Sequence, residues 1–117
     1  MKKALILKNG KIITDNAEIA DSFFTRFKGL MFRKGIAPDY ALHITHCNQI
    51  HMFNMRFPID VVYLSEDGTV VEIHENVPPN KVCKTVKEAK SVIEMNASMS
   101  ARFGILKGDS LEIKAVS

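Results

Sequence analysis

Two short turn signals constrain the fold of this chain more than any other feature. Asn9-Gly10 separates the segments KALILK and KIIT, and Asp67-Gly68 separates IDVVYL from TVVEIH. Asn-Gly and Asp-Gly between apolar segments favour a two-residue hairpin loop, because both central residues of a type I′ turn need a positive φ angle. The flanking segments are typical of short strands. The sequence therefore predicts two antiparallel hairpins in a mainly β chain.

Further turn residues divide the remaining chain into segments of similar length. Pro78-Pro79 and a lysine-rich loop follow the second hairpin, and Gly108-Asp109 precedes a last strand, SLEIKAV. Turns at such short intervals indicate many short strands, about eight in all. Three further strands are expected, at Tyr40 to Thr45, at Ile50 to Phe53 and near Ser91 to Met95.

Two segments break this pattern and predict short helices. Residues 22–28 have Asp21 or Ser22 as N-cap and Gly29 just beyond their end, and residues 97–103 are closed by Gly104. Each has only about two turns, so packing against a sheet must hold it. We therefore expect one mainly β domain over residues 1–117, either a β-sandwich or a partly open barrel, with two short helices.

Length and composition place the chain among single-domain soluble proteins. Two domains in 117 residues would each have a marginal core, and 46% hydrophobic residues suit one packed core. No apolar run approaches the roughly 18–20 residues of a membrane span. The apolar stretch from Ala4 to Leu7 is too short for a signal peptide. We expect a cytoplasmic protein without a membrane partner, with Cys47 and Cys83 as thiols.

Positive charge gathers in one loop without the other features of a nucleic-acid site. The net charge is +3, and residues 80–90 contain four lysines and one glutamate. Nucleic-acid sites usually combine a larger basic patch with arginines and stacking aromatic residues, which this segment lacks. A solvated loop is therefore the expected role, and we expect no nucleic-acid partner.

The second hairpin places two acidic residues at the open end of an apolar face. With a two-residue loop, Leu64 pairs with Val71 and Asp60 pairs with Glu75, whereas a three-residue loop would break this pairing. Two such carboxylates need a cation between them or a proton on one of them. One interpretation is a structural ion pair, and the other is a carboxylate pair that lines a pocket. The arginines considered for the ion pair are Arg26, Arg33 and Arg56.

Asp60 itself stands alone in an apolar run. It is the only charged residue from Phe57 to Leu64, so we expect it to be at least partly buried. A buried carboxylate without a partner costs several kcal/mol. We therefore predict an arginine, Arg26 first, or backbone N–H donors within hydrogen-bonding reach of Asp60.

The cluster HITHCNQIH contains residue types that bind zinc. In an extended chain His43, Cys47 and His51 share one face, and His46 lies on the other. This spacing argues against a shared metal unless the chain turns at Cys47, so we predict no metal site. Methionines beside phenylalanines are more typical of core packing than of a copper site. The sequence contains no glycine-rich elbow or phosphate loop, and we predict no cofactor.

Three long segments match a known pattern in the expected order over nearly the whole chain. They are DSFFTRFKGLMFR, CNQIHMFNMRFPIDVVYLSEDGTVVEIHENVPP and SVIEMNASMSARFGILKGDSLEI, with Arg-x-x-Gly-Leu-Met on Arg26 to Met31 and Ile-His…Met-x-Phe-Pro-Ile-Asp on Ile50 to Asp60. Together they resemble the domain of unknown function 192 family. The resemblance implies a compact, β-rich, sandwich-like fold of bacteria and archaea without an established activity. Relatives often have Gly where this chain has Asn54, and Asn tolerates a positive φ best after Gly.

The residue analysis and the resemblance converge on Arg26, His51 and Asp60. Our leading hypothesis is a binding module, in which a cleft between the Gly-Leu-Met segment and residues 50–60 holds a small polar ligand or a partner's side chain. One alternative is an enzyme with His51 as general acid or base, aided by Asp60 alone or with Glu75. Another is a structural protein without a cleft. The sequence assigns no particular ligand, protein partner or oligomeric state. The predicted ligand-binding residues are Arg26, Met31, His51, Met55 and Asp60.

Overall fold

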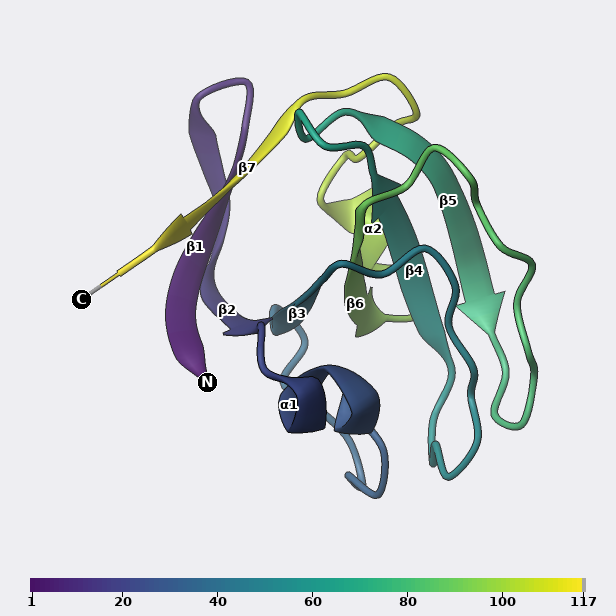
Figure 1. Ribbon diagram of the computed structural model, residues 1–117. Coiled ribbons are helices and arrows are strands. Elements are labelled where there is room, and N and C mark those ends of the chain that lie inside the picture. Colours follow the sequence, from purple (N-terminus) through teal and green to yellow (C-terminus); the bar gives the residue numbers. More distant parts are fainter. Residues whose placement is uncertain (117) are drawn as a thin grey trace.

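Seven strands form one mixed sheet in the order β5-β4-β6-β3-β2-β1-β7 (Figure 1). The computed structural model describes residues 1–116, and two short helices accompany the strands in that range. The prediction of a mainly β domain with two short helices is confirmed, with seven strands where about eight were expected. In chain order the elements are β1 (Lys2–Lys8), β2 (Lys11–Ala20), α1 (Phe23–Lys28), β3 (Ala41–Thr45), β4 (Ile59–Leu64), β5 (Val70–Val77), β6 (Ser91–Asn96), α2 (Met99–Arg102) and β7 (Leu111–Ala115).

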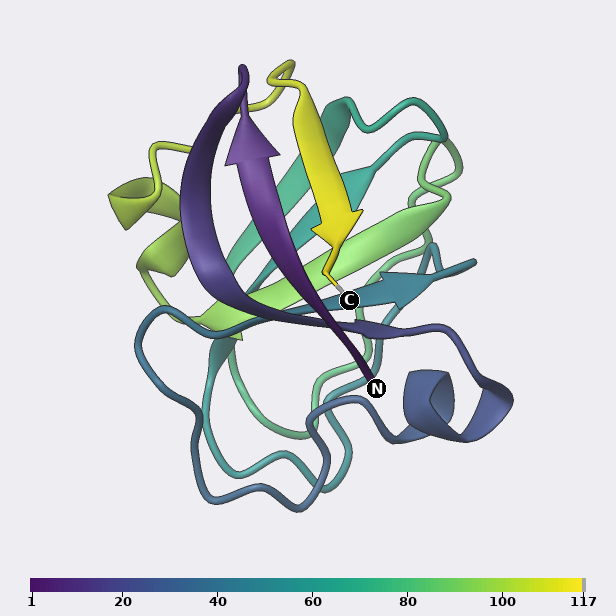
Figure 2. The same ribbon diagram turned by 90° about the vertical axis from the view of Figure 1, so that its left-hand side faces the viewer.

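The sheet curls on itself, so that its two edge strands meet at one end (Figures 1 and 2). Three backbone hydrogen bonds join the segments that lead into them, one of them from the Gly108 N–H to the Val70 carbonyl at 2.8 Å. The Val70 N–H donates to the Asp109 carbonyl at 2.8 Å, and the Leu111 N–H donates to the Gly68 carbonyl at 2.9 Å. Of the two expected architectures, the partly open barrel describes this sheet better than the two-layer sandwich.

One parallel pair of strands, β2 and β3, determines where α1 lies. The register runs from Ala17 opposite Ala41 to Ala20 opposite Ile44, while every other pair of neighbouring strands is antiparallel within residues 1–116. Parallel neighbours need a crossover connection. Here the crossover consists of α1 and residues 29–40, and Leu30 from this segment belongs to the hydrophobic cluster on the outer face of the sheet. The crossover therefore covers that face.

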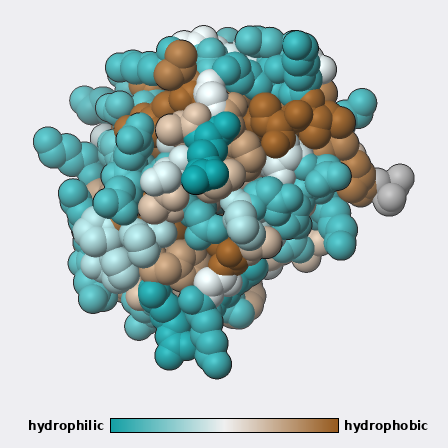
Figure 3. Space-filling view, turned by 180° about the vertical axis from the view of Figure 1, so that it is seen from behind, coloured by the Kyte–Doolittle hydropathy of each residue, from teal (hydrophilic) through white to brown (hydrophobic). Residues whose placement is uncertain are grey.

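Strand β4 is buried on both faces of the sheet. Every residue of β4 is buried, and its side chains alternate between two hydrophobic clusters. Val62 and Leu64 belong to the inner cluster, inside the curled sheet, and Val61 and Tyr63 belong to the outer cluster. The outer cluster lies under the crossover, the loop before β4 and the loop between β5 and β6. The surface seen from behind in Figure 3 is mostly polar and has small apolar areas.

The first hairpin has the predicted two-residue loop. Lys8 lies opposite Lys11, and Asn9 and Gly10 have φ angles of 51° and 80°. These positive angles are the ones that a type I′ turn requires. The turn residues therefore determined this loop as expected.

The second hairpin has a three-residue loop, so its predicted register is wrong at the turn. The Ser65 N–H donates to the Thr69 carbonyl at 2.9 Å, which encloses residues 66–68. Leu64 consequently lies opposite Val70, and not opposite Val71 as predicted. A register shift follows between Tyr63 and Leu64. A bulge of this kind changes which residues face each other without changing the strands themselves.

The predicted strand from Ile50 to Phe53 is also wrong. This segment forms only an isolated bridge at His51, and the Met52 N–H donates to the Lys81 carbonyl at 2.7 Å. The chain then turns at Asn54, whose φ is 62°. Residues 46–58 are therefore a loop over the outer cluster, because a positive φ interrupts an extended chain.

Asp60 is fully buried, with donors from two other elements. Its Oδ1 accepts a hydrogen bond from the Asn76 N–H at 2.9 Å, and its Oδ2 accepts two from Ser100, from the N–H at 3.0 Å and the hydroxyl at 2.6 Å. The prediction of backbone donors is confirmed. Arg26 is not among the partners, and Glu75 is exposed at a second bulge in β5. Asp60 and Glu75 therefore form neither an arginine-bound ion pair nor a carboxylate pair lining a pocket.

We expect Asp60→Asn to destabilise the protein by about 3 kcal/mol or more, because hydrogen bonds to a buried charge are worth about 1.5–3 kcal/mol each. The asparagine amide would also place a donor where Asp60 accepts three hydrogen bonds. Urea unfolding monitored by far-UV circular dichroism measures the change. Ser100→Ala removes one of the three hydrogen bonds and is expected to cost less. An unchanged unfolding midpoint for Asp60→Asn would show that this network does not stabilise the fold.

Candidate functional site

A cavity of about 170 Å³ lies between the crossover and the outer face of the sheet. Its walls come from the end of α1, the loop after it, β3, the loop before β4, and β6. Most of the lining is apolar, and its polar or charged residues are Arg26, Lys28, Gln49, His51 and Glu94. The apolar side chains include those of Leu30, Met31, Ile44, Ile50 and Met55. The cavity therefore lies between the Gly-Leu-Met segment and residues 50–60, where the sequence predicted a cleft.

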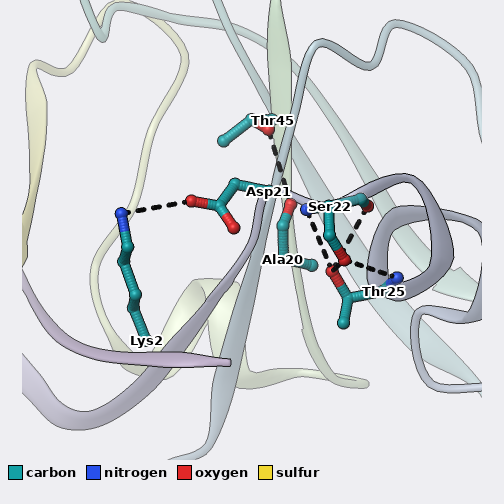
Figure 4. Close-up of polar contacts among 6 residues, drawn as sticks. All are labelled: Lys2, Ala20, Asp21, Ser22, Thr25 and Thr45. Carbon is teal, nitrogen blue, oxygen red and sulfur yellow. Dashed lines mark hydrogen bonds and ion pairs between the residues drawn. The ribbon is translucent and has the colours of Figure 1, made fainter.

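The N-terminus of α1 is fixed by a capping box (Figure 4). The Ser22 hydroxyl accepts a hydrogen bond from the Thr25 N–H at 3.1 Å, and the Thr25 hydroxyl accepts one from the Ser22 N–H at 3.2 Å. Ser22 is thus the N-cap, one of the two residues predicted. The Thr45 hydroxyl also donates to the Ala20 carbonyl at 3.4 Å. These bonds hold a six-residue helix that buries none of its own residues.

Arg26 attaches α1 to the end of β3. Its Nε donates to the Thr45 carbonyl at 2.8 Å, and its Nη2 donates to the His46 carbonyl at 2.6 Å. These carbonyls end the strand, and the guanidinium group has the planar donors to bind both. Arg26 therefore forms one wall of the cavity and does not contact Asp60.

Glu94 is the buried acidic residue of this cavity, and the sequence analysis did not identify it. Only 5% of its surface is exposed, and no hydrogen bond or ion pair from residues 1–116 reaches its carboxyl group. Burial raises its pKa from 4.5 to about 7. The carboxyl therefore exists in both protonation states near neutral pH, as expected for a desolvated acid without a partner.

Gly29 allows the main chain to approach this carboxyl group. A Cβ atom at position 29 would lie 3.4 Å from Glu94 Oε1 and 3.7 Å from Ile44 Cδ1. The φ of Gly29 is 49°, which L-residues seldom adopt. A larger residue would therefore narrow the cavity at Glu94 and strain the end of α1.

Cys47 lines the same cavity as a thiol. Its Sγ donates to the Gln49 carbonyl at 3.2 Å. Burial is the largest effect and raises the pKa of Cys47. The backbone hydrogen bond to Gln49 opposes it, the nearby Glu94 charge adds a smaller increase, and Arg26 opposes that in turn. A raised pKa disfavours the thiolate, which is the nucleophilic form.

His51 lies at the mouth of the cavity among aromatic rings. Its Nδ1 accepts a hydrogen bond from the Phe53 N–H at 3.3 Å. Its ring centroid is 5.3 Å from that of Phe53 and 6.4 Å from that of Phe27. Because Nδ1 is an acceptor, the neutral ring carries its proton on Nε2.

The structure brings together four of the predicted ligand-binding residues. Arg26, Met31, His51 and Met55 all line the cavity, whereas Asp60 does not. Glu75 lines a separate hollow beside Lys81 and Lys84. The three candidate catalytic residues, His51, Asp60 and Glu75, are therefore not assembled at one site.

Of the four residues considered as zinc ligands, His46, Cys47 and His51 lie beside α1, and His43 lies apart from them. His43 lies opposite Ile93 of the inner cluster, and neither of its ring nitrogens has a hydrogen-bond partner in the part of the chain that is described. Cys47 and His51 lie on the outer face at the cavity. Within residues 1–116, no three His, Cys, Asp or Glu side chains are placed to share a metal ion.

A family model matches almost the whole of this fold. The model is DUF192, described as "Uncharacterized ACR", and it matches residues 4–113. This chain belongs to the DUF192 family. The match confirms the resemblance found in the sequence.

Relatives of this DUF192 chain occur in archaea under the name UPF0127 protein. The one from Pyrococcus furiosus is 32% identical over 92% of this chain and 95% of its own length. The Pyrococcus abyssi protein is 35% identical over 81% of this chain and 83% of its own length. The Thermococcus sibiricus protein is 40% identical over 59% of this chain, a match that spans 47% of that relative.

Two solved structures have the same fold as this DUF192 chain. A candidate transcription regulator from Sinorhizobium meliloti is 29% identical, with a TM-score of 0.79 over 96% of this chain and 92% of that one. A protein of unknown function from Novosphingobium aromaticivorans is 24% identical, with a TM-score of 0.79 over 94% of this chain and 83% of that one. In the described residues no helix is long and apolar enough to cross a membrane.

Glu94 and His43 are expected to have opposite effects on the pH dependence of stability. The pKa of Glu94 is raised from 4.5 to about 7, so the free energy of unfolding falls as pH rises between these values. Burial lowers the pKa of His43 from 6.5 to about 4, so the free energy of unfolding rises as pH rises between those values. Each effect is on the order of 3 kcal/mol, at about 1.4 kcal/mol per pKa unit.

Single variants should separate the two effects. Relative to the wild type, we expect Glu94→Gln to show a steeper rise in unfolding free energy between pH 4.5 and 6.5, and His43→Gln a fall. Urea titrations at several pH values in this range measure both slopes, with the other carboxyl groups common to all three proteins. Parallel curves for the wild type and Glu94→Gln would contradict a raised pKa at Glu94.

Proposed function

We propose that this protein is a binding module whose cavity beneath α1 receives the positively charged end of a ligand at Glu94. The observation that supports this most is the Glu94 carboxyl group, which is buried in a cavity wall without a hydrogen bond or ion pair from residues 1–116. A buried carboxylate without a partner is costly. A cation from outside the chain would offset that cost and would keep Glu94 ionised.

The lining of the cavity supports a ligand with an apolar body. The wall contains five aliphatic or methionine side chains together with Phe27 and Cys47, and Glu94 is the one acidic residue that lines it, alongside the basic Arg26 and Lys28. Ligand sites commonly combine apolar walls with a few placed polar groups. The volume of about 170 Å³ is below the range of about 300–1,000 Å³ for drug-sized ligands, so the group held here is about the size of one side chain.

A catalytic role has less support than a binding role. The enzyme alternative required His51 to act with Asp60 or Glu75, and neither of these carboxylates lines the cavity. Asp60 already accepts three hydrogen bonds within the fold. The Cys47 pKa is raised by burial, which disfavours a thiolate nucleophile.

We expect n-butylamine to bind at Glu94 and to bind more tightly as pH rises. The amine stays protonated from pH 6 to pH 8, while the ionised fraction of Glu94, with a pKa of about 7, rises from about one tenth to about nine tenths. Affinity should therefore increase about tenfold over this range. Titration followed by two-dimensional NMR measures it, with the amide signals of Gly29, Ile44 and Cys47 as reporters of the cavity.

Two controls test whether the charge of Glu94 is responsible. Glu94→Gln should abolish the pH-dependent binding, and the variant should fold because it removes a buried charge. Glu88→Gln removes the same charge from an exposed position and should leave binding unchanged. If n-butanol or butyrate bound as tightly as n-butylamine, or if Glu94→Gln bound the amine as the wild type does, the proposed function would be wrong.

A further inference from the structure

The cavity at Glu94 continues into a second hollow along α1. This hollow has a volume of about 370 Å³ and shares Arg26, Phe27, Ile44, Cys47 and Gln49 with the cavity. Its remaining lining comes from Phe23 at the start of α1 and from residues 46–48 after β3. The two hollows adjoin along α1, and we call them together the groove, with Glu94 lining only the first of them. A group the size of one side chain fills only the Glu94 end of it.

The helix beside this groove exposes aromatic side chains. None of the six residues of α1 is buried, and Phe23, Phe24 and Phe27 are each more than half exposed. Phe32 and Phe53, from the loops next to the cavity, are also largely exposed. Clusters of exposed apolar side chains usually mark an interaction surface. The groove therefore has a buried acid at one end and aromatic residues along its edge.

We infer that the groove binds a segment of a partner polypeptide, with a lysine of that segment inserted at Glu94 and its apolar neighbours against the phenylalanines of α1. This inference rests on the proposed function, because it identifies the cation received by Glu94. A lysine fits because its apolar stem suits the walls formed by Ile44 and Leu30, and its compact charge suits the carboxyl. Aromatic side chains also attract cations and pack against apolar neighbours.

The groove extends beyond the Glu94 cavity into the second hollow, and this favours a polypeptide over a free amine. A free amine contacts only the Glu94 end, whereas an extended segment with a central lysine also covers the second hollow and the exposed phenylalanines. Interfaces of this kind depend on one anchor in a pocket surrounded by apolar contacts. The Glu94 cavity provides the pocket, and α1 provides the surrounding contacts.

The experiment titrates the full chain with peptides Ac-Gly-X-Lys-X-Gly-amide, in which X is Leu, Phe, Met, Ser or Asp. We expect peptides with apolar X to bind at least about tenfold more tightly than n-butylamine, a difference of about 1.4 kcal/mol. Acetylation of the lysine, or Glu94→Gln in the protein, should remove this binding. Isothermal titration calorimetry at pH 8 measures all of these affinities.

A substitution at Phe24 distinguishes binding of the peptide from binding of the free amine. Its side chain is 68% exposed and lines neither hollow, so Phe24→Ser should weaken the apolar peptides several-fold and leave n-butylamine unaffected. Leu106 is 67% exposed in the loop between α2 and β7, at the other end of the molecule from α1 (Figures 1 and 2). Leu106→Ser is therefore the matched control and should change neither affinity.

Each contrary result identifies what has failed. If n-butylamine binds through Glu94 and no peptide binds more tightly, the proposed function stands and the polypeptide partner is wrong. If Glu94→Gln changes the affinity of neither n-butylamine nor the peptides, both the proposed function and the polypeptide partner are wrong. Phe24-dependent binding to phosphatidylglycerol vesicles, or Phe24-dependent self-association in sedimentation, without binding of the peptides, would show that α1 contacts a membrane or a second copy and would overturn the inference.

Discussion

The arrangement of β4, β5 and α2 depends on the hydrogen bonds of one carboxylate, that of Asp60. It connects β4 to the bulge at Asn76 in β5 and to Ser100 in α2. A helix of four residues is not stable alone, and Ser100 is its only buried residue. Asp60 therefore fixes α2 against one end of the inner cluster. The crossover packs against the opposite, outer face of the sheet.

The sheet buries two carboxylates in opposite circumstances. Asp60 lies opposite Met95 and Glu94 lies opposite Val61, so the two acids are one register position apart and point to opposite faces. Asp60 has three donors from the fold, and Glu94 has none among the described residues. The interactions of the fold account for the burial of Asp60. They do not account for the burial of Glu94, and for that reason we place the function on the outer face.

Local chemistry was predictable from the sequence, and register was not. The first hairpin and the cap at Ser22 depend on residues next to each other in the chain, and both were predicted correctly. The second hairpin depends on side-chain bonds within its loop, where the Asp67 carboxylate accepts from the Thr69 N–H at 3.2 Å. Such bonds favour a loop of another length, and the alternation of a strand does not reveal the bulges that follow.

The candidate site was predictable only in part for the same reason. A lone charge in an apolar run indicated that Asp60 is buried, and the same reasoning applies to Glu94 within Ser91–Asn96. The sequence does not show which lone acid receives donors from the fold, because Asn76 and Ser100 reach Asp60 only through tertiary structure. The cavity lies next to β6 because the parallel crossover covers that face of the sheet. No local sequence pattern predicts this crossover.

The crossover and the loop before β4 lie outside the strand pairing of the barrel but form most of the cavity wall. The barrel is built from strands and their inner cluster, while most of the cavity wall comes from residues 26–31 and 47–55, which lie outside the strands. Neither segment takes part in the pairing of the seven strands, although Leu30, Ile50 and Met52 within them are buried in the outer cluster. The shape of the cavity is therefore set mostly by residues that take no part in strand pairing, with Ile44 of β3 and Glu94 of β6 as the exceptions.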